Sequence, residues 1–412
     1  MKEYFREIEG GVCAPKGFSA ASHAAGIKYQ GRDDMALIFS DTPCITAGTF
    51  TSNNVKAAPV IWDLRIVHSE KKVRAVVANS GIANAATGKP GMEICEKTAA
   101  ALSECYGGDK DEVLVASTGV IGMQIDTDRI TAGCRALYEK RAAGTEAATA
   151  AARAIMTTDT KKKEISVELS LSDGKTVRIG AMTKGSGMIH PNMCTMLGFV
   201  TTDAAIDKAL LQKALTAIVD ESFNMISVDG DTSTNDTYVV LSNGEAGNRL
   251  IDTEDEDYER FFEALRYVSL SLARRMAADG EGASCLFECK VSGARSLGDA
   301  RMLAKSVIGS SLCKAAIFGN DSNFGRFLCA LGYSGVSFDP EQVDIWYESA
   351  AGKLKIVEGG LGTDYDEAEA TKLLDQPEVT VLVDMHMGNE SATAWGCDLS
   401  YDYVKINADY RS

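Results

Sequence analysis

Histidine is scarce in this chain, and the scarcity limits the chemistry that we expect. The 412 residues include only four histidines, and none of them stands near another in the sequence. A Ser-His-Asp triad, or a metal site built from several histidines, therefore has few residues to draw on. The glycine-rich turns NSGIANAATG and ASTGVIG match neither GxGxxG nor a P-loop, and neither KGSGM nor HMGNE completes a GxSxG or HExxH motif.

Long hydrophobic runs are also missing, and the charge is strongly one-sided. No stretch of about 18 apolar residues is present, so the sequence predicts no membrane-spanning helix. The chain opens with MKEYFREIEGGVCAPKG, which contains no apolar signal segment, and we expect a cytoplasmic protein. A net charge of -16 argues against nucleic acid and anionic membranes as partners. A small anionic ligand is still compatible with that charge, because one pocket can be locally basic.

The cysteines are numerous but form no recognisable framework. Eleven is an odd number, so internal disulfides cannot use all of them, and no CxxC pair is present. Cys285 and Cys289 are the closest pair and have no histidine nearby, which favours core packing over a metal site. We expect free, mostly buried thiols, as in a reducing compartment, and no bound metal.

A β-hairpin is the clearest local structure that the sequence predicts. In EISVELSLSDGKTVRIGAM, apolar residues alternate with polar ones on both sides of the turn Asp173-Gly174. Further strands are expected in VRAVVANSG, EVLVASTG, TYVVLSNG and EVTVLVDM. The hairpin favours a largely antiparallel sheet over a doubly wound parallel one.

Helices are predicted between these strands. GMEICEKTAAALSECYG and EAATAAARAIM are rich in helix formers, and DKALLQKALTAIVDESF has apolar residues at helical spacing. A further helix is expected from Thr253 to Gly280, and it opens with the capping-box spacing Thr253 to Glu256. Strands and helices mixed in this way indicate layered α/β or α+β packing.

One segment places a thiol and a hydroxyl side by side after a glycine-rich turn. It reads KGSGMIHPNMCTMLGFVTTDAAI, and the two neighbours are Cys194 and Thr195. A hydroxyl nucleophile needs a base, and an N-terminal residue can use its own α-amino group, whose pKa is roughly 7.7–8.0. Thr195 would reach that state by attacking the preceding carbonyl and cutting the backbone. On the residues alone, a buried threonine that begins a strand is the simpler interpretation.

The same segment resembles the self-cleavage segment of the ornithine acetyltransferase family, whose members also serve as glutamate N-acetyltransferases. The usual family form is KGxGMIxPNMATMLxFxTTDA. Other signatures follow in the family's order: GVCAPKGFSAASHAAGIK, FTSNNVKAAPV, NSGIANAATG, ASTGVIG, AIMTTDT, VDGDTSTNDT, DGEGAS, GNDSNFGR and GNESATAWGCDLSYDYVKINADYRS. The likeness runs almost from end to end, and several of these motifs are long and rarely found elsewhere.

The resemblance implies a fold and a division of the chain. The fold is of mixed α/β (α+β) class, an αββα-type sandwich that is shared with self-processing aminopeptidases. The precursor cuts itself between Cys194 and Thr195, which gives an α chain of residues 1–194 and a β chain of residues 195–412. We expect two α and two β chains to assemble into a heterotetramer.

The resemblance also implies the reaction. An acetyl group moves from N2-acetyl-L-ornithine to L-glutamate in arginine biosynthesis, and some family members use acetyl-CoA as the donor; no other cofactor is implied. Thr195 attacks the acetyl carbonyl and carries the acetyl group as an ester. The hydroxyl of Thr118 and the backbone N–H of Gly119 match the family's oxyanion donors.

Further positions match the family's substrate contacts. Ornithine and glutamate share an α-carboxylate and the reacting amine, so one pocket must serve both. Lys184 can bind a carboxylate, and Glu281 can bind a cationic δ-amine. The remaining matches are Thr157, Asn407 and Ser412. The neighbour of Thr157 is a second threonine with the same hydroxyl, so this match is the least specific of the set.

The chain departs from the family pattern at several positions. Cys194 stands where alanine is usual, and a thiol is itself a strong nucleophile, so a cut before Cys194 is the alternative to a cut before Thr195. The other departures, which could shift substrate preference, are Ile82, Ala86, Cys285, Ser322 and Phe324.

Two other functions stay open at this point. A self-cleaving amidohydrolase or aminopeptidase of the same fold would pass the acyl group to water, whereas a binding protein would keep the scaffold without catalysis. The first differs from an acetyltransferase only in the acceptor. His190, five residues before Thr195, is an alternative base, although the family pattern does not require histidine there.

Overall fold

The computed structural model describes residues 4–190 and 196–409. The chain divides into two compact units. Unit 1 comprises Met1–Gly185, Asn192–Phe223 and Thr232–Leu272, and unit 2 comprises Ser186–Pro191, Asn224–Asp231 and Ala273–Ser412. Neither unit coincides with one of the two predicted chains, because unit 1 takes residues from both sides of position 194. The division into α and β chains stays a prediction.

Unit 1 contains a nine-stranded sheet, counted over the described residues. The strand order is β1-β6-β7-β8-β10-β3-β4-β5, and β2 also pairs with β3. The strands are β1 (Phe5–Ile8), β2 (Phe18–His23), β3 (Met35–Phe50), β4 (Val73–Asn79), β5 (Val113–Ser117), β6 (Lys163–Ser170), β7 (Thr176–Lys184), β8 (Leu197–Thr202) and β10 (Thr237–Ser242). The pairs β8–β10 and β4–β5 are parallel and the others antiparallel, so the predicted antiparallel character is confirmed.

The predicted hairpin is the pair β6–β7, which runs in antiparallel register from Lys163 opposite Thr183 to Ser170 opposite Thr176. Its turn contains Gly174 at φ +77°, a conformation that favours glycine. β7 also pairs with β8, and β8 pairs with β10 on its other side. The long strand β3 pairs with β10 through its second half and with β2 and β4 through its first half.

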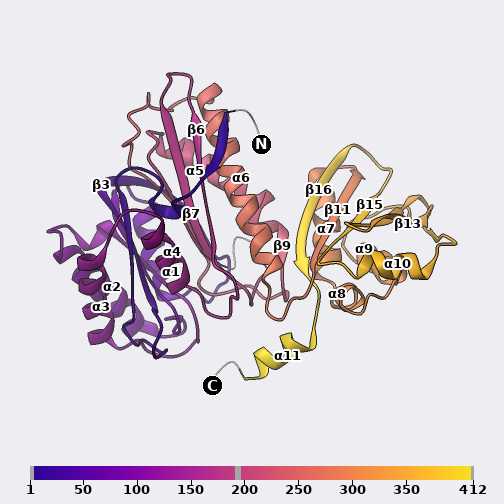
Figure 1. Ribbon diagram of the computed structural model, residues 1–412, viewed down its shortest axis with the longest axis horizontal. Helices are drawn as coiled ribbons and strands as arrows, with labels where there is room; N and C mark the ends of the chain where they lie inside the picture. The colour runs from indigo at the N-terminus through magenta and orange to yellow at the C-terminus, as the bar shows by residue number, and fades with distance from the viewer. Residues whose placement is uncertain (1–3, 191–195, 410–412) are drawn as a thin grey trace. The chain divides into compact units, whose positions relative to one another are not determined.

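Helices cover the sheet of unit 1. They are α1 (Ala58–Val67), α2 (Gly88–Glu104), α3 (Thr127–Lys140), α4 (Thr145–Ala154), α5 (Lys208–Glu221) and the first part of α6 (Glu256–Ala278). In Figure 1, α1 to α4 gather around the part of the sheet that contains β3, and they pack against β2, β3 and β5. The four helical segments predicted from the sequence correspond to α2, α4, α5 and α6.

The start of α6 corrects one sequence prediction. The capping-box spacing placed the cap at Thr253, but the helix begins at Glu256. The carboxylate of Asp255 accepts from the N–H groups of Asp257 and Tyr258 at 3.1 and 3.2 Å. A carboxylate directly before the first helical residue satisfies the free N–H groups of the first turn, and its charge suits the positive end of the helix. Thr253 therefore lies two residues too early to cap α6.

Strands β4 and β5 contribute mostly buried, apolar residues to the core of unit 1. All five residues of β5 are buried, and helix α1 covers them. The indole Nε1 of Trp62 donates to the carbonyl of Val113 at 3.0 Å, and Asp63 Oδ1 accepts from the N–H of Val115 at 2.9 Å. Side chains of α1 therefore form hydrogen bonds with backbone groups on the outer edge of β5. Complete burial raises the pKa of Asp63 well above its usual range.

Unit 2 contains a seven-stranded sheet in the described residues, in the order β14-β13-β12-β15-β11-β16-β9. Its strands are β9 (Ile226–Ser227), β11 (Leu286–Ala294), β12 (Asp344–Ser349), β13 (Gly352–Glu358), β14 (Leu361–Gly362), β15 (Glu378–Asp384) and β16 (Glu390–Cys397). Its helices are α7 (Leu297–Gly309), α8 (Ser311–Phe318), α9 (Phe324–Gly332), α10 (Glu367–Leu374) and α11 (Tyr401–Ala408). Helix α7 packs on β11 and β16, and α10 on β12 and β13 (Figure 1).

Two sheets with helices packed on them give the mixed α/β (α+β) class that the sequence predicts. The cysteines that the structure describes are all free, and most are buried. Cys285 and Cys289 are both buried, as their core-packing interpretation predicts. No helix within the described ranges is both long and apolar enough to cross a membrane.

Candidate active site

The carboxyl ends of β4 and β5 bring two glycine-rich turns together. These strands pair in parallel with Asn79 opposite Ser117, so both turns leave the same edge of the sheet. The N–H of Thr118 donates to the carbonyl of Asn79 at 3.0 Å, and the N–H of Val120 donates to the carbonyl of Gly81 at 3.0 Å. Ser117 Oγ donates to Asn79 Oδ1 at 2.7 Å, which ties the strand ends further.

Gly119 lies between these two bonded residues in a conformation that favours glycine. Its φ is +129°, and a Cβ atom there would lie 2.2 Å from the carbonyl carbon of Gly81. This close approach explains the glycine at position 119. Within the described part of the chain, the N–H of Gly119 has no hydrogen-bond acceptor, whereas the N–H groups on either side of it are both used. The Gly119 N–H is therefore available to an incoming anion.

Lys184 supplies a positive charge beside Thr118. It ends β7, and its Nζ donates to Thr118 Oγ1 at 3.2 Å. Only 8% of Lys184 is exposed. An ammonium group has no acceptor, so the Thr118 oxygen must accept this bond and the hydroxyl proton points elsewhere. Thr118 therefore keeps a donor for a second partner.

A buried carboxylate holds the backbone next to Lys184. Asp159 Oδ1 accepts from the N–H of Gly185 at 2.8 Å and from Lys163 Nζ at 2.7 Å. Its Oδ2 accepts from the N–H of Thr157 at 3.1 Å. Burial by itself raises the pKa of Asp159, but the ammonium groups of Lys184 and Lys163 outweigh it, and with these hydrogen bonds they hold the pKa at about 2. Asp159 is thus charged at neutral pH and links Thr157 to Lys184.

Strand β8 connects this group to the predicted nucleophile. Leu197, its first residue, pairs with Lys184 in register. The carbonyl of Met196 accepts a backbone N–H at the start of β10 at 2.8 Å. Cys194 and Thr195 themselves lie outside the described residues. The predicted cut therefore falls just before a segment that is hydrogen-bonded into the same sheet as Lys184.

In unit 2, Glu281 and Asn407 form a pair. Asn407, on α11, donates through Nδ2 to Glu281 Oε2 at 2.7 Å. Glu281 is buried, and its N–H donates to the carbonyl of Ser186 at 2.9 Å. A Cβ atom on Gly187 would lie 2.3 Å from the Glu281 carboxylate, so the second glycine of KGSGM makes room for this side chain. Ser412 lies outside the described residues.

The chain before the predicted cut is held by residues 227–229 of unit 2. The Asp229 carboxylate accepts from two consecutive N–H groups, at 2.6 and 2.8 Å, the first of them from Met188. Met188 has φ +55°, which is uncommon for a residue with a side chain, and these bonds stabilise it. His190 Nδ1 lies 2.9 Å from Ser227 Oγ. Burial, with Lys305 nearby, lowers the pKa of His190 to about 4, so the ring is neutral at pH 7.

Comparison with known proteins confirms the resemblance. The model of the ArgJ family matches residues 19–412. The chain belongs to the ArgJ family. A protein of Symbiobacterium thermophilum named Arginine biosynthesis bifunctional protein ArgJ is 51% identical over 407 residues, which cover 98% of this chain and 99% of that protein.

Two solved structures are also similar to this chain. The arginine biosynthesis bifunctional protein of Bacillus halodurans is 46% identical, with a TM-score of 0.49 over 51% of this chain and 97% of that one. The ornithine acetyltransferase of Mycobacterium tuberculosis, solved in complex with ornithine, is 41% identical, with a TM-score of 0.41 over 46% of this chain and 100% of that one.

Two of the departures of this ArgJ-family chain have a local structural explanation. Ile82 is buried and forms a parallel bridge with Val120, next to Gly119. Ser322 Oγ donates to the hydroxyl oxygen of Tyr365 at 2.9 Å. Apolar packing and a local hydrogen bond therefore account for these two substitutions, and nothing in the structure explains Ala86, whose φ is +55°.

Asp159 and Lys163 are the residues of this ArgJ-family site that sequence reasoning missed. Their side chains are 0% and 1% exposed and four residues apart. The motif AIMTTDT contains Asp159, and a lysine four residues after it was a signal for a buried ion pair. Thr157, which the resemblance selected, contributes its backbone N–H to this carboxylate. The structure thus brings Thr118, Gly119, Lys184 and Thr157 together in unit 1, and Glu281 and Asn407 together in unit 2.

Proposed function

We propose that this chain is an N-acetyltransferase of arginine biosynthesis, which moves the acetyl group of N2-acetyl-L-ornithine to L-glutamate. One observation carries the proposal: the N–H of Gly119 has no acceptor among the described residues, and Lys184 Nζ lies 3.2 Å from the hydroxyl oxygen of Thr118, the residue before Gly119. Two donors and a cation of this kind stabilise the oxyanion of acyl transfer. Membership of the ArgJ family, and the bifunctional arginine biosynthesis name of its relatives, support the same reaction.

The nucleophile in this proposal is Thr195, after an autocatalytic cut between Cys194 and Thr195. The Thr195 hydroxyl attacks the carbonyl carbon of Cys194, and the peptide C–N bond breaks. Water then hydrolyses the resulting ester, which leaves a carboxylate on Cys194 and a free α-amine on Thr195. That amine, with a pKa of roughly 7.7–8.0 when unperturbed, serves as the base in later turnovers.

Acetyl transfer then proceeds in two half-reactions. Thr195 Oγ attacks the acetyl carbonyl while the α-amine takes the hydroxyl proton, and the oxyanion accepts hydrogen bonds from Thr118 and Gly119. Each such donor contributes roughly 2.7–4 kcal/mol in other enzymes. The C–N bond to ornithine breaks, and the leaving amine takes the proton. The glutamate amine next attacks the acetyl ester, which releases N-acetylglutamate and restores the Thr195 hydroxyl.

The substrate contacts follow from charge. Lys184 attracts the α-carboxylate that ornithine and glutamate share, and Glu281 attracts the cationic end of ornithine. The bond from Asn407 to Glu281 fixes the direction of that carboxylate. Thr157 and Ser412 complete the proposed set of contacts.

The proposed α and β chains share one sheet. β8 and β10 belong to residues 195–412, and they lie between β7 and β3 of residues 1–194. The backbone hydrogen bonds on both sides of this pair hold the cut chains together. We expect two α and two β chains in the assembled enzyme.

A product assay tests the proposed function. Purified protein is incubated with acetylornithine in the presence and absence of glutamate, and with acetyl-CoA plus glutamate, with Thr195→Ala as the inactive control. We expect N-acetylglutamate from acetylornithine only when glutamate is present. The reaction with acetyl-CoA shows whether the protein also transfers an acetyl group from acetyl-CoA to glutamate. Release of free acetate at the same rate without glutamate would instead identify a hydrolase.

A further inference from the structure

Unit 1 contains a basic pocket that shares one lining residue, Asp159, with the candidate active site. Its volume is about 700 Å³. It is lined by Arg32, Asp33, Arg153, Asp159, Lys161 and Lys162, together with a few small or apolar side chains. Four cations therefore face two carboxylates, in a chain whose net charge is -16. Of the two carboxylates, Asp159 already bonds Lys163, which leaves Asp33 as the only other negative charge among these lining residues.

Arg32 is fixed in its orientation but keeps most of its donors. Its Nη2 donates to the carbonyl of Met156 at 2.6 Å, and its guanidinium carbon lies 4.5 Å from the centre of the Tyr29 ring. Stacking of this kind holds the planar guanidinium in place. A guanidinium has five N–H donors, so a single bond leaves several of them for a ligand. Within the described ranges, Arg32 forms no ion pair.

Arg153, the other arginine of the basic pocket, also forms no ion pair among the described residues. It lies in the last turn of α4, where a positive charge interacts well with the helix dipole. The dipole favours the charge but does not satisfy the guanidinium N–H groups. Several other arginines of unit 1 do meet carboxylates, as Arg65 meets Asp111 at 2.7 Å and Arg266 meets Glu221 at 2.6 Å.

The two lysines of the basic pocket differ. Lys162 forms an ion pair with Glu164, and its Nζ also donates to Thr149 Oγ1 at 3.2 Å. The charge of Lys162 is therefore partly neutralised. Lys161 is exposed. Asp33, the opposing carboxylate, accepts from the hydroxyl of Ser22 at 2.5 Å. Arg32 and Arg153 add two further positive charges that form no ion pair among the described residues.

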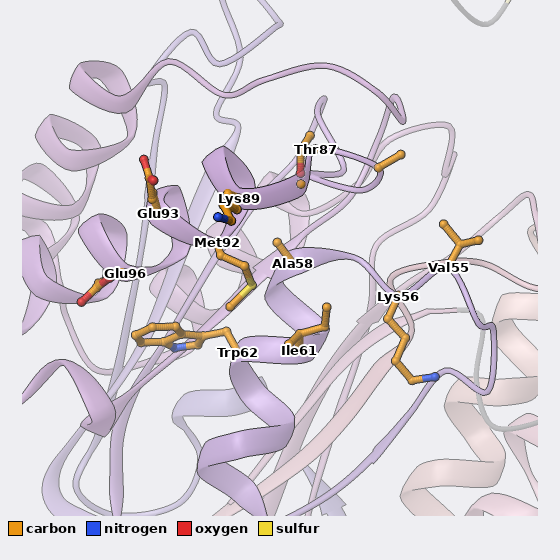
Figure 2. Close-up of a pocket in the computed structure, with 12 residues that line it drawn as sticks. Val55, Lys56, Ala58, Ile61, Trp62, Thr87, Lys89, Met92, Glu93 and Glu96 are labelled. Carbon is orange, nitrogen blue, oxygen red and sulfur yellow. The ribbon is translucent and has the colours of Figure 1, made fainter.

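A second pocket of unit 1 shows that this imbalance is not general. It has a volume of about 480 Å³ and lies between α1 and the start of α2 (Figure 2). Its floor is formed by Trp62 and Met92, and its charges are Lys56 and Lys89 against Glu93 and Glu96. Cations and carboxylates are equal in number there, so this second pocket has no comparable preference for an anion.

We propose that the basic pocket binds a ligand that carries two or more linked phosphate groups. Arginine forks match phosphate oxygens with two parallel hydrogen bonds, and two arginines that line one pocket suit two neighbouring phosphates. A single carboxylate would use only one of them. A volume of about 700 Å³ lies in the range of pockets that hold drug-sized ligands, so it has room for a nucleoside attached to the phosphates. This site goes beyond the proposed function and does not depend on it.

Calorimetric titration tests the proposal on the full-length protein in a buffer without phosphate. The probes are pyrophosphate, ADP and adenosine. We expect saturable binding of pyrophosphate and ADP that weakens as salt is added, and none of adenosine. Equal affinity for pyrophosphate and ADP means that the pocket recognises the phosphates alone, whereas tighter ADP binding means that the nucleoside also contributes. No saturable binding of either, or adenosine binding as tightly as ADP, would overturn the proposal.

Variants locate the binding. Arg153→Gln is the first choice, because Arg153 is exposed and its loss leaves no carboxylate unpaired. The double variant Arg32→Gln, Arg153→Gln removes both guanidinium groups from the pocket. We expect pyrophosphate affinity to fall at least about tenfold in the double variant and less in Arg153→Gln. Lys89→Gln, in the second pocket, is the matched control and should bind like wild type. Unchanged affinity in Arg153→Gln and in the double variant would show that the pocket is not the site. No acetyl transfer is measured, so failure of the proposed function does not affect this test.

Discussion

The ammonium nitrogen of Lys184 lies 3.2 Å from the hydroxyl oxygen of Thr118. Lys184 is also the register partner of Leu197, two positions after the predicted nucleophile Thr195. One lysine therefore links the strand that leads away from Thr195 to the residue expected to stabilise the oxyanion. Because the Thr118 oxygen accepts from Lys184, its proton is left for the oxyanion, and the positive charge of Lys184 strengthens the same site.

Removal of the Thr118 hydroxyl should slow acetyl transfer. We expect Thr118→Ala to lower kcat by roughly 10²–10³ if the hydroxyl is one of two oxyanion donors. Thr118→Ser keeps the hydroxyl and should stay much closer to wild type. The measurement is the steady-state rate with acetylornithine and glutamate on fully cleaved protein. A wild-type rate for Thr118→Ala would mean that Thr118 is structural.

Asp159→Asn should reduce both stability and activity. The substitution leaves the buried ammonium of Lys163 without its carboxylate, and breaking a buried pair costs about 3–5 kcal/mol. The double variant Asp159→Asn, Lys163→Met removes both charges and should recover part of that loss. Denaturant unfolding measures the free energy of unfolding of each variant. The acetyl-transfer rate, measured at a temperature where all variants are folded, shows whether the loss of the Asp159 charge beside Lys184 lowers activity. Equal stability of wild type and Asp159→Asn would contradict this view of the pair.

The same carboxylate predicts a pH dependence. The pKa of Asp159 is lower in the folded state, at about 2, than its ordinary value in the unfolded chain. Its contribution to stability is therefore complete above that ordinary value, roughly 3.9, and is lost as the pH falls toward 2. The stability gap between wild type and Asp159→Asn should narrow across this range.

Regular local patterns could be predicted from the sequence, and long-range contacts could not. The hairpin β6–β7 followed from alternation around Asp173-Gly174, and the oxyanion candidates followed from motif likeness. Asp159 was missed because its role depends on Gly185, which is 26 residues away in the chain. The cap of α6 was placed at Thr253 because a local spacing rule cannot compare two competing oxygens, and Asp255 has the better position.

Processing should give two fragments that stay together. Wild type should separate under denaturing conditions into residues 1–194 and 195–412, and Thr195→Ala should remain a single chain. N-terminal sequencing of the second fragment distinguishes Thr195 from Cys194 as its first residue. Under native conditions the fragments should co-elute, because β8 and β10 are hydrogen-bonded to β7 and β3. A start at Cys194, or an uncut wild type with full activity, would contradict the assignment of Thr195.

His190→Asn should leave the acetyl-transfer rate within a few-fold of wild type. Burial, with Lys305 nearby, lowers the pKa of His190 to about 4, so a rate that depended on its neutral form would level off above that pH. An α-amine base instead gives a rate that rises through roughly pH 7.7–8.0. The pH profile must be measured on fully cleaved protein, because residues 188–190 precede the cut. A loss of roughly 10²-fold or more in cleaved His190→Asn would place His190 in the active site as the base.

Asp63→Asn should stabilise the protein at neutral pH. Burial raises the pKa of Asp63 well above its usual range, so the folded state holds a proton that the unfolded state releases. The stability linked to this group is therefore present below the ordinary pKa of Asp63 and is lost as the pH rises above it.

Asparagine at position 63 keeps an oxygen for the Val115 N–H, which in the wild type bonds Asp63 Oδ1 at 2.9 Å, and asparagine does not ionise. We expect a gain in the free energy of unfolding at pH 7 and a smaller gain toward pH 4. Asp63→Ala is the control, because it removes the acceptor and should destabilise at every pH. Thermal unfolding of the three proteins is measured at pH 4 and pH 7. A wild type that is more stable than Asp63→Asn at pH 7 would contradict the prediction that Asp63 is protonated in the folded state.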